Sequence, residues 1–194
     1  MRERDPAPAP ADISIPLGFL TDLTNAASEE DLYALIANGL PAIVRCSRIS
    51  LSVPASPGKL RVISVEGTRI VERDDDVPVD GTGIGYCFQA RTPVLIDDVE
   101  TVGELPFDKA PLVRRAMRSV AILPLLAGGN CLGTLNFSDM APCRFTPQTR
   151  NTLFAIAACI ASQIRLHKSL TELKGHQARF DAIIDNADAL IFAK

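Results

Sequence analysis

Residues 119–137, SVAILPLLAGGNCLGTLNF, contain two apolar runs on either side of the tetrapeptide AGGN. Gly128 and Gly129 can adopt the positive φ angles that a tight turn requires, so the stretch predicts a β-hairpin. Apolar residues occupy both faces of the first arm, which indicates a central strand. Pro124 conflicts with that position, because proline donates no ladder hydrogen bond and usually marks an edge strand or a bulge.

Two further β-type runs precede this hairpin, ISLSV at 49–53 and LRVISV at 60–65. The intervening PASPGK has the composition of a hairpin loop. The acidic stretch 72–76 that follows predicts a solvated loop. These runs therefore add a second hairpin to the sheet.

Helical periodicity brackets the strands. Leucines at helical spacing predict a short helix over residues 15–27. Ser28 and Asp31 form a capping-box-like start for a second helix, which Gly39 and Pro41 should weaken or kink. Between the hairpins, the sequence predicts short helices at 84–90 and 109–117 and a strand at 93–97.

The longest predicted helix begins with Thr146 as N-cap and Pro147 at the first helical position. Beyond residue 161 its apolar positions follow alternating steps of four and three, the rhythm of a coiled coil. One helix alone cannot bury so narrow a seam, which predicts a parallel homodimer. The seam consists of Leu166, Leu170, Leu173, Gln177, Phe180 and Ile184. The strand-like run at 189–193 has no pairing partner, so we expect these 194 residues to be a fragment of a longer protein.

The bulk properties exclude several classes. The composition is 47% hydrophobic and 22% charged, as in a soluble globular protein, and the net charge is −3. That balance argues against nucleic acid or an anionic membrane as the main partner. The proline-rich residues 1–13 read as a disordered leader rather than a signal peptide, and the longest apolar run, 154–161, is too short to span a bilayer. Five cysteines without a C-x-x-C pair suit a reducing, cytoplasmic compartment.

The order of these elements resembles the GAF domain. The likeness is carried by GTGIGYCFQARTPVLIDDV (81–99), AILPLLAGGNCLGTLNF (121–137) and FTPQTRNTLFAIAACIASQI (145–164). The family's hairpin often carries a proline where Pro124 stands. The resemblance implies an α+β fold with a central antiparallel sheet, the N- and C-terminal helices on one face, loops and short helices over the other, and a long C-terminal coiled-coil helix.

The same resemblance divides the chain. A disordered leader at 1–13 precedes a GAF-like sensory domain at 14–165 and a coiled-coil signalling helix at 166–179. Residues 180–194, including FDAIIDNADALIFAK, are similar to the start of a PAS domain. Such an arrangement implies a sensory module of a two-component or related signal-transduction protein, with an effector of histidine kinase, diguanylate cyclase or transcriptional activator type.

Several chemistries fit the sequence poorly. Gly81, Gly83 and Gly85 form G-x-G-x-G without a following lysine, which favours a tight turn over a phosphate loop. Among the positions that resemble cyclic-nucleotide-binding GAF domains, Phe137 replaces the lysine and Thr149-Arg150 the acidic pair. The histidines His167 and His176 are nine residues apart, on opposite sides of a helix, so we expect no metal site.

The favoured hypothesis is a ligand-sensing module with no catalytic residue, no metal and no cofactor, and with an unidentified small-molecule ligand. We expect a homodimer through the N- and C-terminal helices, with Leu166, Leu170, Leu173, Gln177 and Phe180 at the interface. Two alternatives stay open: a structural dimerisation module with a self-filled pocket, and an enzyme similar to free methionine sulfoxide reductase that uses Cys87. The pocket should lie under residues 81–90 and 98–117, with Asp98 as polar anchor and an apolar lining of Cys87, Phe88, Ile96, Phe107, Met117, Val120, Ile122, Leu135 and Phe137.

Overall fold

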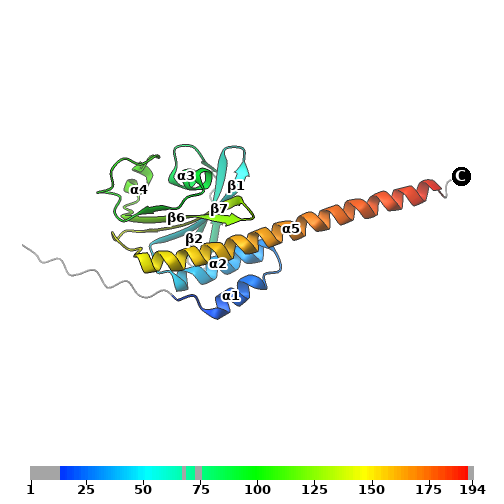
Figure 1. The fold of residues 1–194 in the computed structure, drawn as a ribbon, viewed down its shortest axis with the longest axis horizontal. Helices are drawn as coiled ribbons and strands as arrows, with labels where there is room; N and C mark the ends of the chain where they lie inside the picture. The colour runs from blue at the N-terminus through cyan, green and yellow to red at the C-terminus, as the bar shows by residue number, and fades with distance from the viewer. Residues whose placement is uncertain (1–13, 67–68, 73–75, 192–194) are drawn as a thin grey trace, which may run out of the picture.

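The computed structural model describes residues 14–66, 69–72 and 76–191. Within these residues the chain forms five helices around one antiparallel sheet (Figure 1). The helices are α1 (Leu17–Thr24), α2 (Glu29–Ile43), α3 (Gly83–Ala90), α4 (Ala110–Arg114) and α5 (Pro147–Ile191). The strands are β1 (Arg48–Ser56), β2 (Lys59–Glu66), β3 (Arg69–Glu72), β4 (Val77–Pro78), β5 (Val94–Ile96), β6 (Ser119–Ala127) and β7 (Asn130–Asp139).

The sheet has the order β3-β2-β1-β7-β6-β5, and the short β4 pairs with β2. All strand pairings among the described residues are antiparallel. In the middle of the sheet, Asn136 of β7 lies opposite Ser50 of β1 on one side and Ile122 of β6 on the other. This register sets which side chains share a face, because side chains alternate along a strand.

Helices α1, α2 and α5 cover one face of the sheet, and the smaller α3 and α4 lie over the other (Figure 1). The main apolar core lies between the sheet and α1, α2 and α5. A smaller cluster of buried side chains, around Cys87, Phe107 and Ile122, lies beneath α3. The predicted α+β architecture is therefore confirmed, including the placement of the terminal helices on one face.

Local signals place several elements as expected. The Ser28 hydroxyl accepts a hydrogen bond from the Asp31 amide at the start of α2, and Thr146 Oγ1 accepts one from the Thr149 amide at the start of α5. Gly128 and Gly129 take φ angles of 58° and 79° in the hairpin turn. A bulge between Pro124 and Leu126 interrupts the β6–β7 register, which is how a central strand accommodates its proline.

The structure also differs from the sequence expectations. The first hairpin is tighter than PASPGK suggested, because β1 extends to Ser56 and β2 begins at Lys59. Strands β3 and β4 were not predicted. Residues 189–191 are helical rather than extended, since a continuing helix satisfies its own backbone hydrogen bonds and a lone strand does not. The predicted leader and residues 192–194 lie outside the described residues.

Helix α5 continues far beyond the domain (Figure 1). Its first half packs on the sheet through buried residues such as Leu153, Ile156 and Ile160. No helix in the described part of the chain has the length and apolarity that a bilayer span requires.

Candidate functional site

A cavity of about 320 Å³ lies between the sheet and the two short helices α3 and α4. A smaller recess of about 80 Å³ adjoins it and shares Arg48, Ser50 and Ile122 with it. The larger space is within the range of small-molecule sites. Its walls are Arg48, Ser50, Val62, Val77, Thr82, Gly83, Ile84, Phe107, Asp108, Pro111, Leu112, Arg114, Arg115 and Ile122.

Strand alternation decides which residues reach this cavity. On β6, Val120 and Ile122 belong to the cluster beneath α3, whereas Ala121 and Leu123 belong to the core beneath α5. The same alternation turns Ser50 of β1 toward α3 and α4, together with Asn136 and Ser138 of the neighbouring β7. Strand β6 is thus a single layer between the cavity and the long helix.

The recess beside the cavity has polar residues, Ser50 and Asn136, on its floor. Asn136 Nδ2 donates to Ser52 Oγ at 2.9 Å and to Ser50 Oγ at 3.3 Å. Asn136 is only 8% exposed, and its Oδ1 has no hydrogen-bond partner. A buried acceptor without a donor costs about 1–3 kcal/mol. The floor of the recess therefore contains a group whose hydrogen-bonding capacity is unused.

The rim of the cavity is basic. Arg48 lies at the start of β1, and Arg114 and Arg115 lie at the end of α4. Asp108 is the one acid among the described lining residues, and its Oδ1 accepts a hydrogen bond from the Ala110 amide. The local charge is therefore opposite in sign to the net charge of the chain.

Helix α3 and the residues before it form the roof. The Thr82 hydroxyl caps α3 by accepting from the Gly85 amide at 3.0 Å. A Cβ atom at Gly85 would lie 1.7 Å from the Val79 carbonyl oxygen, so glycine is required for this close approach. The ring of Phe107 packs against Tyr86 with a centroid distance of 6.1 Å. These contacts hold α3 and the 98–109 loop together over the cavity.

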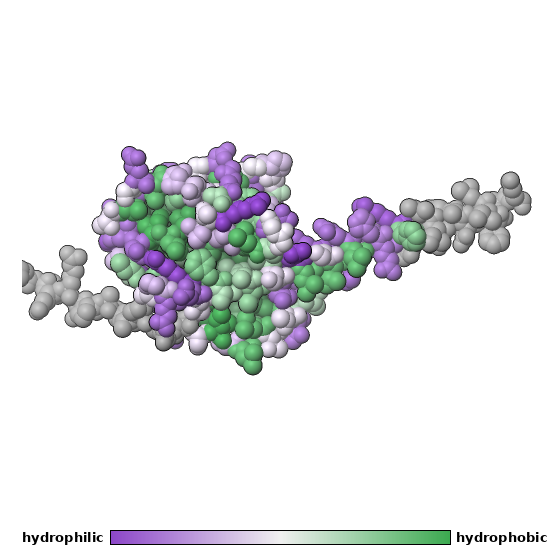
Figure 2. All heavy atoms as spheres, in the orientation of Figure 1, coloured by the Kyte–Doolittle hydropathy of each residue, from purple (hydrophilic) through white to green (hydrophobic). Residues whose placement is uncertain are grey.

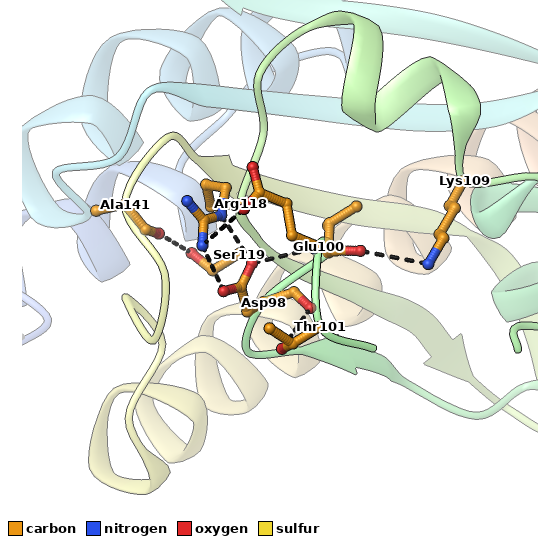
Figure 3. A network of polar contacts seen from close by, with 8 residues as sticks. Asp98, Glu100, Thr101, Lys109, Arg118, Ser119 and Ala141 are labelled. Atoms are coloured by element: carbon orange, nitrogen blue, oxygen red, sulfur yellow. Dashed lines mark hydrogen bonds and ion pairs between the residues drawn. The ribbon is translucent and has the colours of Figure 1, made fainter. Parts of the chain in front are cut away.

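Asp98 organises the loop beside the cavity (Figure 3). Its carboxylate accepts hydrogen bonds from Arg118 Nε at 2.7 Å and Nη2 at 2.5 Å, and its Oδ1 also accepts from the Glu100 amide. The hydrogen bonds from Arg118 hold the pKa of Asp98 below its ordinary value and raise that of Arg118. Lys109 Nζ closes the loop by donating to the Val102 carbonyl at 3.0 Å. Asp98 lines neither the cavity nor the recess, and its role as a ligand anchor stays a prediction.

The predicted lining is only partly brought together. Phe107, Met117, Val120 and Ile122 line the cavity or its recess. Cys87 and Ile96 are buried in the cluster beneath α3, and half-buried Phe88 lines neither space.

Two predicted residues on β7 belong mainly to the other face. Leu135 is buried in the core beneath α5 and lines neither the cavity nor the recess. Phe137 borders the recess, but its ring packs against Phe145, with a centroid distance of 6.4 Å. The missed residues are the polar ones, above all Arg48, Ser50 and Asn136. The alternation of polar and apolar residues in ISLSV and TLNFS is the signal that could have identified the last two.

The described residues offer little for metal or thiol chemistry. Burial raises the pKa of Cys87 to about 12, and its Sγ lies 3.5 Å from the Ile122 carbonyl oxygen as a donor. None of the five cysteines, all within the described residues, forms a disulfide. The described ranges contain no group of three or more His, Cys, Asp or Glu side chains that could hold a metal ion.

Comparisons with known proteins agree with this architecture. The GAF domain of an Acinetobacter phosphoenolpyruvate-protein phosphotransferase superposes with a TM-score of 0.64 at 12% identity, over 80% of this chain and 93% of that one. Free methionine-R-sulfoxide reductase from Neisseria meningitidis, solved with its substrate, gives 0.62 at 14% identity, over 78% and 87%. The GAF-B domain of DevS from Mycobacterium smegmatis gives 0.56 at 21% identity, over 73% and 96%. A comparison with curated protein sequences gives no match.

The family model for the GAF domain matches residues 28–164, which is most of the chain. Those residues contain the whole sheet, the cavity and the part of α5 that packs on the domain. The protein therefore belongs to the GAF domain family.

Proposed function

We propose that this protein is a regulatory module that binds a small molecule in the cavity and transmits the bound state through α5 to an effector. The observation that carries this proposal is the position of β6, which borders the cavity with Ile122 and packs against α5 with Leu123. Of the described elements, only strand β6 lies between this part of the cavity and α5, so a shift of Ile122 on ligand binding would act on α5 through β6. A methyl-accepting chemotaxis protein among the structural neighbours supports a sensory role.

Helix α5 carries an exposed apolar stripe where it leaves the domain. Leu166, Leu170, Leu173 and Phe180 are 49%, 45%, 63% and 63% exposed. Figure 2 shows apolar atoms along this part of the helix beside strongly polar ones. A seam of this spacing is buried in a parallel coiled coil, and we infer that its partner is a second copy of the chain, with Gln177 completing the interface.

The hairpin turn offers a second route from the cavity roof to α5. Arg91, the residue that ends α3, donates from Nη1 to the Gly129 carbonyl at 2.8 Å. A Cβ atom at Gly128 would lie 2.3 Å from Arg165 Nη1, so the Arg165 side chain packs over the same turn. Arg165 directly precedes the exposed stripe. Movement of α3 would therefore shift α5 where the proposed coiled coil begins, and a population shift between two helix rotations is the mechanism we infer.

Dimerisation tests the output half of this proposal. Leu170→Glu combined with Leu173→Glu should convert a dimer into a monomer, because charges in the seam cannot be buried. Ser169→Glu with Thr171→Glu adds the same charge outside the seam and should leave the dimer intact. Multi-angle light scattering after size-exclusion chromatography distinguishes the two. A dimer that persists in the seam variant contradicts the proposal.

Native mass spectrometry of the purified chain tests the input half. We expect a measured mass that exceeds the mass of the protein by that of a bound small molecule. We also expect the dimer dissociation constant, measured by sedimentation, to change when this molecule is removed and added back. A chain that binds nothing and whose dimer is indifferent to added metabolites would instead be a structural dimerisation module.

We expect no catalytic step in this module. A thiol with a pKa near 12 is protonated at neutral pH and is a poor nucleophile, which counts against Cys87 as a reductase cysteine. Turnover of free methionine sulfoxide that is lost in Cys87→Ser would overturn this expectation. The five unpaired cysteines suit a reducing cytoplasm, and the effector we propose is of kinase, cyclase or transcriptional activator type.

A further inference from the structure

We propose that the cavity takes a small organic anion, with a carboxylate or phosphate at the arginine rim, a compact apolar body, and a hydrogen-bond donor at its inner end. This inference rests on the proposed function, which requires only that some small molecule occupies the cavity. Three features of the walls carry it: charge, the unused acceptor of Asn136, and the apolar residues between them.

The charge at the rim selects for an anion. Among the residues that the structure describes, three arginines and one aspartate line the cavity, in a chain whose net charge is −3. Basic residues around a partly enclosed, low-dielectric space concentrate anions there and disfavour cations. Asp108 Oδ1 accepts a hydrogen bond from the Ala110 amide, and its single negative charge is outnumbered by the arginines among the described lining residues.

The geometry of guanidinium selects for oxyanions. Each guanidinium has five N–H donors in a planar fork, which matches the two oxygens of a carboxylate or phosphate. Arg48 and Arg115 each interact with another part of the protein, and a guanidinium with five donors can bind more than one acceptor. Arg48 comes from the sheet and Arg115 from α4, and both border the cavity and its recess. An anion between them would join the floor to the roof.

The inner end of the site requires a donor rather than a second anion. Asn136 is 8% exposed and borders the recess, and its Nδ2 is occupied by Ser50 and Ser52 while its Oδ1 is unpaired. A hydroxyl or amine on the ligand would satisfy this acceptor. Between rim and floor the walls are apolar, including Ile84, Leu112 and Ile122. The ligand is therefore amphipathic, with its charge at one end.

Isothermal titration with matched probes tests the proposal. The probes are 4-hydroxybenzoate and its neutral isostere 4-hydroxybenzamide, with benzoate to test the inner donor and phenyl phosphate to compare phosphate with carboxylate. We expect 4-hydroxybenzoate or phenyl phosphate to bind at least about ten-fold more tightly than the amide, as charge-assisted hydrogen bonds allow. We also expect 4-hydroxybenzoate to exceed benzoate.

Substitutions of the rim arginines test whether the probes bind in the cavity. Arg48→Gln and Arg115→Gln should each abolish the preference for acid over amide, whereas Arg179→Gln, on the exposed part of α5, makes the same change far from the cavity and should preserve it. Circular dichroism checks that each variant is folded, and Arg114→Gln replaces either one that is not.

Equal binding of acid and amide, or a preference that survives the rim substitutions, would overturn the anion inference. If the neutral probe binds and shifts the dimer dissociation constant, the sensory function stands while this inference fails. If no probe of either charge binds and the dimer does not respond, both fail.

Discussion

Neighbouring residues on β6 provide a direct test of the cavity. Ile122 and Leu123 are both buried, at 4% and 0% exposure, but Ile122 borders the cavity and Leu123 is enclosed by the core beneath α5. Replacing either by alanine removes three carbon groups, a transfer loss of about 2.4 kcal/mol at about 0.8 kcal/mol per methylene. Leu123→Ala also creates a new void in a packed core, which brings its total cost to about 4 kcal/mol.

Ile122→Ala should cost less, because the space it vacates joins a cavity that already exists and adds no new void. We therefore expect about 2 kcal/mol for Ile122→Ala, so that the two variants differ by about 2 kcal/mol. For a chain of this size that corresponds to a Tm difference of roughly 4–8 °C.

Urea unfolding followed by circular dichroism measures both free energies, at one fixed protein concentration because dimerisation makes stability concentration-dependent. The urea m-value should be unchanged in both variants, which shows that the denatured state is the same. If Ile122→Ala destabilises as much as Leu123→Ala, then Ile122 is packed in a closed core. That result would refute the cavity and favour the structural dimerisation module.

Three further predictions follow from individual groups. The folded-state pKa of Asp98 is lowered by Arg118, so its stabilising contribution is full above the unfolded value near 3.8 and is lost as pH falls below it; acid titration of Tm should show a steeper loss in wild type than in Asp98→Asn. Parallel titration curves would show that the ion pair contributes nothing. Cys87, with a pKa near 12, should react with iodoacetamide at pH 8 far more slowly than exposed Cys143, as peptide mapping by mass spectrometry would show. Rapid labelling of Cys87 would instead indicate an accessible, reactive thiol. Gly85→Ala should lower Tm by several degrees, since its Cβ would meet a backbone carbonyl oxygen at 1.7 Å, whereas Gly103→Ala meets nothing within 4 Å and serves as control. Equal Tm values for the two glycine variants would contradict the tight α3 approach.

Elements with strong local signals were predictable from the sequence. The Gly128-Gly129 turn, the Ser28 cap and the Thr146-Pro147 helix start each depend on residues adjacent in the chain, and the structure has all three. Strands β3 and β4 have no such signal, because they are short and are defined by pairing with β2. The stability of a short strand depends on packing against its neighbours more than on its own residue types, so local patterns do not reveal it.

The residues that line the cavity were hard to identify from the sequence for a related reason. Both faces of β6 are apolar, so its pattern does not tell which face meets the cavity. On β7 the expectation that ligand pockets are apolar favoured Leu135 and Phe137 over Asn136. Leu135 lies in the core beneath α5, because α1, α2 and α5 bury the more apolar face of the sheet and leave polar positions on the other face. Arg48 meets Arg114 and Arg115 at the cavity only through the fold, since it lies far from this arginine pair in the sequence.

The polar floor distinguishes a sensor from a scaffold. A module that only dimerises needs a closed core, and leucine or valine at Asn136 would remove an unpaired buried acceptor and fill space. The protein instead retains an asparagine supported by two serines, beneath a rim of arginines, at the one layer of strands that separates the cavity from α5. Local features that reduce stability without a structural benefit are concentrated at functional sites. Asn136 Oδ1 is such a group at the recess, whereas Leu123 of β6 and Leu135 of β7, which face α5, are apolar. This is the distribution expected when ligand binding supplies the missing interaction and α5 responds to it.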